Sequence, residues 1–263
     1  MNVLGIIPAR GGSRGIPRKN LAIVGGKTLL RRAIEGAQAA KRIDRLIVST
    51  DCDEIAQEAE RCGATVEMRP PELADDNAST LLVLLWHLHQ SDIKPDAVLC
   101  LQPTCPLRRP SDIDGAIGML EHTRCDSVVS YFPVEGDHPA RMATINDFDR
   151  TVTVFGECFA SREGGVNYGN VFAQRQKLQV IYQRSGDIYL TRTGVLDRGS
   201  LTGDDQRAWI IAKDRSATSI VRLIWCWLRH WWSITEASDH DYPGVSFLLC
   251  VDNARNCRGR IVL

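Results

Sequence analysis

Residues 3–7 form a short apolar run that leads directly into a loop rich in glycine and basic residues. The loop carries Arg10, Gly11, Gly12, Arg14, Gly15, Arg18 and Lys19. A short apolar run ended by glycines is typical of a buried β-strand. Glycines let backbone N–H groups point at a ligand, because no Cβ stands in the way. With the positive side chains, they predict a site for a polyanion such as a nucleoside triphosphate.

The loop matches neither of two common glycine-rich nucleotide motifs. A Walker A motif closes with Gly-Lys-Ser/Thr, and a dinucleotide-binding fold has the spacing GxGxxG. The loop contains neither pattern, and a solvated basic turn is the alternative interpretation. Its position directly after the first predicted strand favours the anion-binding interpretation.

Strand and helix patterns alternate through the first half of the chain. Strands are predicted at 3–7, 45–49, 65–69, 97–102 and 127–131, and helices at 28–40, 54–63, 79–90 and 110–122. This alternation predicts an α/β fold with a mostly parallel sheet and helices on both faces. Ligands bind such sheets at the carboxyl ends of the strands. Because the polar segments 8–20, 49–53 and 102–109 follow predicted strands, we expect them to surround one site.

The alternation stops between about residues 133 and 183. This stretch has few long apolar runs and contains Gly136, Gly156, Gly164, Gly165 and Gly169. The composition predicts an inserted arm rather than a second core. A strand pattern resumes at 186–190.

Composition and charge argue against several classes of protein. The 263 residues carry 32 basic and 32 acidic side chains, and zero net charge disfavours a general nucleic-acid surface. There is no signal-peptide pattern and no run of about 18 apolar residues, so we expect no membrane partner. Nine cysteines are scattered without CxxC spacing, which disfavours a zinc site or a disulfide framework. We therefore expect reduced thiols and a cytoplasmic location.

Five segments of the chain, taken in their order along the sequence, carry a resemblance to a known family. They are Pro8–Asn20, Ile47–Asp51, Arg69–Asp76, Leu101–Arg108 and Ser185–Tyr189. Together they resemble the acylneuraminate cytidylyltransferases, the CMP-sialic acid synthetases, whose close relatives activate legionaminic, pseudaminic or Kdo-type sugars. The first and fourth segments are specific, whereas the others alone are weak. The resemblance implies a three-layer nucleotidyltransferase fold with a mainly parallel sheet in residues 1–216, and an arm at about 133–183 that serves dimerisation.

The resemblance also implies roles for single residues. The implied nucleotide-binding residues are Arg10, Gly11, Ser13, Arg14, Lys19, Asn20, Arg69, Ala78 and Thr80. Gln102 resembles the glutamine between nucleotide and sugar, and it is expected to act in catalysis with Arg10 and Lys19. A sugar carboxylate suits arginine. The implied sugar-binding residues are Gln102, Arg141, Arg175 and Tyr189, of which the two arginines reach the site from a neighbouring subunit.

The implied reaction is transfer of CMP from CTP to the anomeric hydroxyl of a nonulosonic acid, a nine-carbon sugar acid, with release of pyrophosphate. Mg²⁺ is the implied cofactor and a homodimer the implied assembly. Two alternatives stay open: a nucleotide-binding pseudoenzyme, and a nucleotidyltransferase for another sugar acid such as Kdo. The sequence identifies neither a general base nor the particular sugar acid.

The resemblance ends after Ser216. The family continues with a string like Ile-Asp-Ile-Asp-Ser/Thr-Glu, whose two aspartates bind Mg²⁺, whereas residues 217–222 read Ala-Thr-Ser-Ile-Val-Arg. Codons permitted for Ala217–Trp227 can encode Asp-Ile-Asp-Ser-Glu-Ala-Asp-Leu-Val-Leu in another reading frame. We therefore predict a frameshift near residue 217, a non-native tail over 217–263, no assignable metal ligand and weakened turnover. A real amphipathic membrane or partner helix is the alternative for the tail.

Overall fold

A computed structural model provides the structure of the chain. It describes residues 1–12, 16–75, 78–91, 94–134, 138–139, 142–145, 151–154 and 180–216. The predicted tail at 217–263 and most of the predicted arm lie outside the described residues. The division of the chain into domain, arm and tail therefore stays a prediction.

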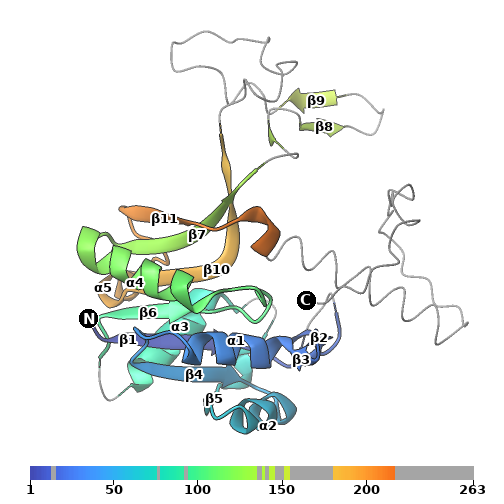
Figure 1. The fold of residues 1–263 in the computed structure, drawn as a ribbon, viewed down its shortest axis with the longest axis vertical. Helices are drawn as coiled ribbons and strands as arrows, with labels where there is room; N and C mark the ends of the chain where they lie inside the picture. Colours follow the sequence, from blue (N-terminus) through green and yellow to red (C-terminus); the bar gives the residue numbers. More distant parts are fainter. Residues whose placement is uncertain are drawn as a thin grey trace, which may run out of the picture.

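The centre of the fold is one seven-stranded sheet (Figure 1). Its strands are β1 (Val3–Pro8), β4 (Arg45–Thr50), β5 (Thr65–Met68), β6 (Ala97–Cys100), β7 (Ser127–Pro133), β10 (Tyr182–Arg192) and β11 (Gln206–Ile210). Their order is β11-β7-β10-β6-β1-β4-β5. Strand β1 pairs in parallel with β4 and β6, β4 with β5, and β11 with β7. Only β10 runs antiparallel to its neighbours in this sheet, so the predicted mainly parallel sheet is confirmed.

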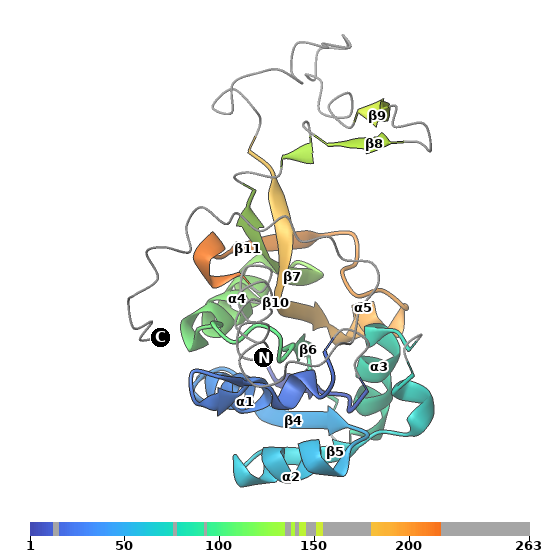
Figure 2. The ribbon, with the colours of Figure 1, turned by 90° about the vertical axis from the view of Figure 1, so that its right-hand side faces the viewer.

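Helices cover both faces of the sheet. The α-helices of the described residues are α1 (Leu29–Gln38), α2 (Asp53–Arg61), α3 (Thr80–Gln90), α4 (Pro110–Thr123) and α5 (Thr193–Asp197). Helices α1 and α4 lie on one face and α3 on the other (Figure 2). The predicted three-layer α/β architecture is therefore confirmed. No helix in the described part of the chain has the length and apolar character needed to cross a bilayer.

Local signals explain where the helices begin and end. Thr28 caps α1, since its Oγ1 accepts a hydrogen bond from the Arg31 N–H at 3.0 Å. Ser79 caps α3 in the same way, through the Leu82 N–H at 3.3 Å. Gly63, with a φ of 71°, follows the end of α2 in the left-handed conformation that favours glycine.

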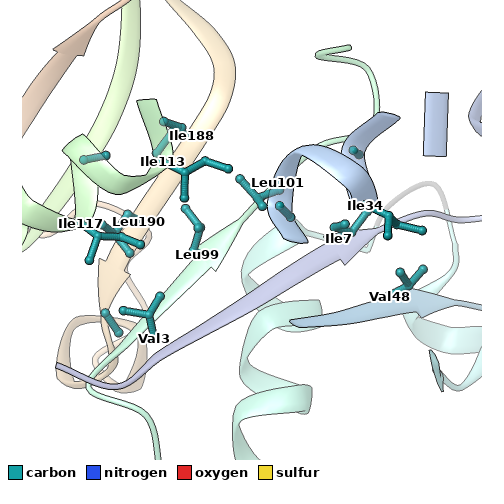
Figure 3. Close-up of a cluster of buried hydrophobic side chains, with 14 of the residues drawn as sticks. Val3, Ile7, Ile34, Val48, Leu99, Leu101, Ile113, Ile117, Ile188 and Leu190 are labelled. Atoms are coloured by element: carbon teal, nitrogen blue, oxygen red, sulfur yellow. The ribbon is translucent and has the colours of Figure 1, made fainter. Parts of the chain in front are cut away.

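The core lies on both sides of β1, whose side chains alternate between the faces of the sheet. Val3 and Ile7 pack into a large cluster that includes Ile34 of α1 and Ile113 and Ile117 of α4 (Figure 3). The opposite face of β1 contributes to a smaller cluster against α3 and α5, built from Leu4, Ile6, Ile47, Leu84, Leu88, Val98, Cys100 and Leu196. Because both faces of β1 are buried, this strand fixes the positions of the two helical layers.

Several features differ from the sequence predictions, among them α5 and β11, which were not predicted. Strand β10 is longer than the predicted 186–190, and its pairing with β7 is interrupted by a bulge between Arg184 and Tyr189. A small hairpin, β2 (Ile23–Val24) and β3 (Lys27–Thr28), turns at two glycines with positive φ. Two further strands, β8 (Ala143–Ile145) and β9 (Thr151–Val154), pair with each other apart from the large sheet (Figure 1).

Candidate functional site

A cavity of about 300 Å³ lies at the carboxyl ends of β1, β5 and β6. Its walls come from the loop after β1, from η1 (Lys19–Leu21), from the segment between β5 and α3, and from the loop after β6. The lining residues are Pro8, Arg10, Gly12, Lys19, Asn20, Arg69, Leu73, Asp75, Ala78, Thr80, Val83, Gln102, Pro103 and Thr104. A volume of this order suits a small-molecule ligand.

Most of the described residues predicted for the site line this cavity. They are Arg10, Lys19, Asn20, Arg69, Ala78, Thr80 and Gln102. Gly11 and Tyr189 do not line it. Ser13, Arg14, Arg141 and Arg175 lie outside the described residues. The structure thus brings segments from three parts of the chain to one place, while the role of each residue stays a prediction.

The charge in the cavity wall is mostly positive. The lining residues carry three cationic groups and one carboxylate. The cationic groups belong to Arg10, Lys19 and Arg69, and the carboxylate belongs to Asp75. Burial, together with the nearby charge of Arg10, lowers the pKa of Lys19. A bound polyanion would favour the charged form of Lys19, so the cavity suits an anionic ligand.

Two hydrogen bonds shape the loop after β1. Asn20 is buried, and its Nδ2 donates to the carbonyl oxygen of Arg10 at 2.9 Å. The Arg10 side chain in turn donates from Nη1 to the carbonyl oxygen of Asp75 at 3.3 Å. Asn20 therefore holds the loop beside the cavity as well as lining it.

Gly11 lies behind the cavity wall and contacts the end of β4. Its N–H donates to Oδ1 of Asp51 at 3.0 Å. A Cβ at Gly11 would lie 2.7 Å from Cβ of Cys52, which is too close for any other residue without a shift of the chain. Asp51 was not among the predicted site residues, although a polar residue directly after a buried strand is a signal that could have identified it.

A buried polar chain connects β4, β5 and α3 next to the cavity. His87 of α3 lies 2.6 Å from Oγ of Ser49 through Nε2, and 2.6 Å from Oε2 of Glu67 through Nδ1. Burial is the main cause that lowers the pKa of His87. These contacts fix the helix whose first turn carries Thr80, and no sequence pattern indicated them.

Gln102 is held from two sides. Arg108 is buried and donates from Nη2 to the carbonyl oxygen of Gln102 at 2.7 Å, and from Nε to that of Asp187 at 2.6 Å. Gly186, with a φ of 83°, lies so close that a Cβ there would be 3.2 Å from Oε1 of Gln102. One guanidinium group thus connects the loop after β6 to the bulge of β10.

Asp187 and Tyr189 of β10 lie outside the cavity wall. Asp187 is 2% exposed, burial raises its pKa, and its Oδ2 has no hydrogen-bond partner among the described residues. Burial also raises the pKa of the Tyr189 phenol, which packs against the smaller core cluster. The expected contact of Tyr189 with a sugar stays a prediction.

The magnesium ion that the resemblance implies stays a prediction. Among the described residues, no three His, Cys, Asp or Glu side chains are grouped to hold a metal ion. Mg²⁺ usually binds one or two carboxylates together with substrate phosphates, and Asp75 supplies the single carboxylate among the residues that line the cavity. The positions at which the family resemblance expects two metal-binding aspartates lie in the segment beyond Ser216, outside the described residues.

Sequence comparison relates most of the chain to proteins of known activity. The family model described as cytidylyltransferase matches residues 4–194. The CMP-N,N'-diacetyllegionaminic acid synthase of Legionella pneumophila is 38% identical over 138 residues, which are 51% of this chain and 59% of that protein. An N-acylneuraminate cytidylyltransferase of Streptococcus agalactiae is 33% identical over 193 residues, which are 73% of this chain and 43% of that protein. The chain thus spans about half the length of these curated relatives.

Solved structures support the fold. A CMP:2-keto-3-deoxy-manno-octonic acid synthetase complexed with CTP superposes with a TM-score of 0.61 at 17% identity, covering 88% of this chain and 100% of that one. A 4-diphosphocytidyl-2C-methyl-D-erythritol synthase from Anaerococcus prevotii gives a TM-score of 0.53 at 12% identity, covering 87% and 96%. At these identities the likeness concerns the fold alone.

The position of Gln102 should depend on Arg108. We expect Arg108→Gln to lower the free energy of unfolding by about 3 kcal/mol, because the shorter glutamine carries its donors on one nitrogen, which cannot reach both buried carbonyl groups. Urea unfolding followed by circular dichroism measures this. Arg109→Gln is the matched control, since Arg109 is the exposed neighbour and should change the value by less than about 0.5 kcal/mol. Equal effects of the two substitutions would contradict the assigned contact.

Proposed function

Because the chain belongs to the cytidylyltransferase family, we propose that it transfers CMP from CTP to the anomeric hydroxyl of a nonulosonic acid in the cytoplasm. The names of the Legionella and streptococcal relatives support a sialic-type acid as the acceptor. The free thiols of the described cysteines support a reducing compartment. The observation that carries the proposal is the cationic cavity at the strand ends, with Arg10, Lys19 and Arg69 in its wall.

In the proposed reaction, the anomeric oxygen attacks the α-phosphorus of CTP. A new P–O bond forms, the bond from the α-phosphorus to the bridging oxygen breaks, and pyrophosphate leaves with that electron pair. The acceptor hydroxyl gives up its proton, for which we assign no base. Arg10 and Lys19 would neutralise charge on the phosphates, while Gln102 would orient the acceptor. Positioning and charge neutralisation by these residues are therefore the expected sources of rate.

The proposed activity is tested by incubating the chain with CTP, Mg²⁺ and a panel of sugar acids, and measuring pyrophosphate release. We expect release with at least one nonulosonic acid, at a rate that depends on the tail considered below. Pyrophosphate release with Kdo alone would favour the alternative of a nucleotidyltransferase for another sugar acid such as Kdo. Nucleotide binding with no release would favour a pseudoenzyme, and a preference for ATP or UTP would overturn the cytidylyl assignment.

Lys19 should contribute to CTP binding through its charge. We expect Lys19→Met to raise the Kd for CTP by about 10- to 100-fold, since a charge-assisted hydrogen bond to phosphate is lost. The affinity of the unmodified chain should fall as the pH rises through the lowered pKa of Lys19, and this pH dependence should disappear in the variant. Isothermal titration calorimetry measures both. Lys94→Met is the control, because Lys94 is exposed and precedes β6 at the opposite end of the strand.

We also propose that the chain forms a homodimer, with Arg141 and Arg175 of one arm serving the sugar site of the other subunit. Exposed apolar side chains at the start of β10 support an association there: Val180 is 64% exposed and Tyr182 49%. Sedimentation velocity at micromolar concentration should show a dimer. A monomer across that range would contradict the proposal.

For residues 217–263 we propose a frameshifted tail that weakens turnover. The charge stabilisation that a metal ion supplies is worth several kcal/mol, so a chain without its carboxylate ligands should react several decades more slowly. A chain in which the alternative reading frame restores the Asp-Ile-Asp string should recover the rate. The coding DNA around codon 217 checks the premise, and full activity of the chain as printed would refute the proposal.

A further inference from the structure

Arg18 is one of the basic residues of the loop after β1, but it does not line the cavity, whereas Arg10 and Lys19 do. The side chain of Arg18 is 65% exposed and pairs with the carboxylate of Glu54 in the first turn of α2. An exposed pair of this kind contributes little to stability. The side chain of Arg18 is thus directed to α2, and the charge of the loop does not explain this residue.

The backbone of Arg18 is in the left-handed conformation, with a φ of 54° and a ψ of 30°. Among the described residues other than glycine, Arg124 alone also has a positive φ, and it lies at the end of α4, where a left-handed residue is common. Arg18 instead precedes a helical turn. The conformation is unfavourable for a residue with a Cβ, and it persists only where the surrounding structure requires it.

The residues directly after Arg18 are the ones that enter the cavity wall. The short helix η1 begins at Lys19, and the carbonyl oxygen of Arg18 accepts from the Leu21 N–H at 2.9 Å. Lys19 is half-buried in the wall, and Asn20 is buried with its Nδ2 bonded to the carbonyl oxygen of Arg10. A negative φ at Arg18 would send η1 in another direction, so both side chains depend on this one backbone angle.

We propose that Arg18 is a positioning residue and not a phosphate ligand: its left-handed backbone turns Lys19 and Asn20 into the cavity. This role rests on the proposed function, in which the cavity binds nucleotide phosphates. It separates two properties of position 18, the charge of the side chain and the conformation of the backbone. Glycine and asparagine remove the charge but accept the left-handed conformation, whereas a β-branched residue removes the charge and opposes the conformation.

The test compares Arg18→Gly, Arg18→Asn and Arg18→Val, using calorimetric titration with CTP and with inorganic tripolyphosphate. We expect the glycine and asparagine variants to keep both Kd values within about threefold, and the valine variant to raise both by about tenfold. Arg18→Ala opposes the conformation less strongly and should raise them by about threefold. It supplies the comparison with glycine should the valine variant fail to fold, which circular dichroism reports.

Arg109→Val is the matched control. Arg109 is exposed and has a φ of −99°, so this change removes the same charge at a position where valine is unstrained. It should leave both Kd values unchanged.

The pH dependence of tripolyphosphate binding gives a second readout, which a general loss of stability would not produce. The fall in affinity through the lowered pKa of Lys19 should persist in Arg18→Gly and weaken in Arg18→Val, because Lys19 leaves the cavity wall only in the second variant. The titration of the ligand itself is the same in both experiments and cancels in the comparison.

Two results would overturn the proposal while leaving the proposed function intact. Equal losses of affinity in the glycine, asparagine and valine variants would show that Arg18 acts through its charge. Unchanged affinity in the valine and alanine variants would show that the backbone conformation has no effect on binding. An unmodified chain that binds neither CTP nor tripolyphosphate would instead refute the proposed function, and the role of Arg18 with it.

Discussion

The parallel pairing of β1 with β4 and β6 is the constraint on which the site depends. Ile6 pairs with both Ile47 and Cys100. Because the three strands are parallel and in this register, their carboxyl ends lie at the same edge of the sheet. The loops that follow must then meet, although they are far apart in the sequence. A shift of β1 by one residue would turn its apolar side chains to the wrong faces of a sheet that is covered on both sides. Core packing therefore holds the cavity in place.

The burial that stabilises the sheet also determines the electrostatics at its edge. Cations in the cavity wall are partly removed from water, and the carbonyl and carboxylate groups around them compensate only in part. A buried donor that has no partner among the described residues, such as Nε of Arg69, costs free energy in the folded chain.

The sequence predicted those strands and helices that are marked by a pattern of a few consecutive residues. Apolar runs identified β1 and β6, and the caps at Thr28 and Ser79 fit the predicted helix starts within two residues. Strand β11 was missed because it lies at the sheet edge and three of its five residues are exposed, so neither an apolar run nor a regular alternation marks it.

The same limit applies to the candidate site. Basic and amide residues at strand ends were predicted, because charge in a glycine-rich loop is a local signal. The groups that hold them were not, because Asp51 lies 40 residues from Gly11 and Arg108 lies 79 residues from Asp187. The sequence does not predict such pairs, because it is the folded sheet that brings the two residues of each pair together. The role of Arg14, which lies outside the described residues, stays a prediction.

Strand β10 lies between β6 and β7 in the sheet, although the chain leaves β7 at Pro133 and begins β10 only at Tyr182. Its hydrogen bonds to both neighbours close a loop that begins at the end of β7. The entropy of closing such a loop grows only with the logarithm of its length, by about 0.6 kcal/mol for each doubling. By this relation, the closure entropy of the connection between Pro133 and Tyr182 changes little with its length, so the pairing of β10 in the sheet depends far more on its neighbours than on that length.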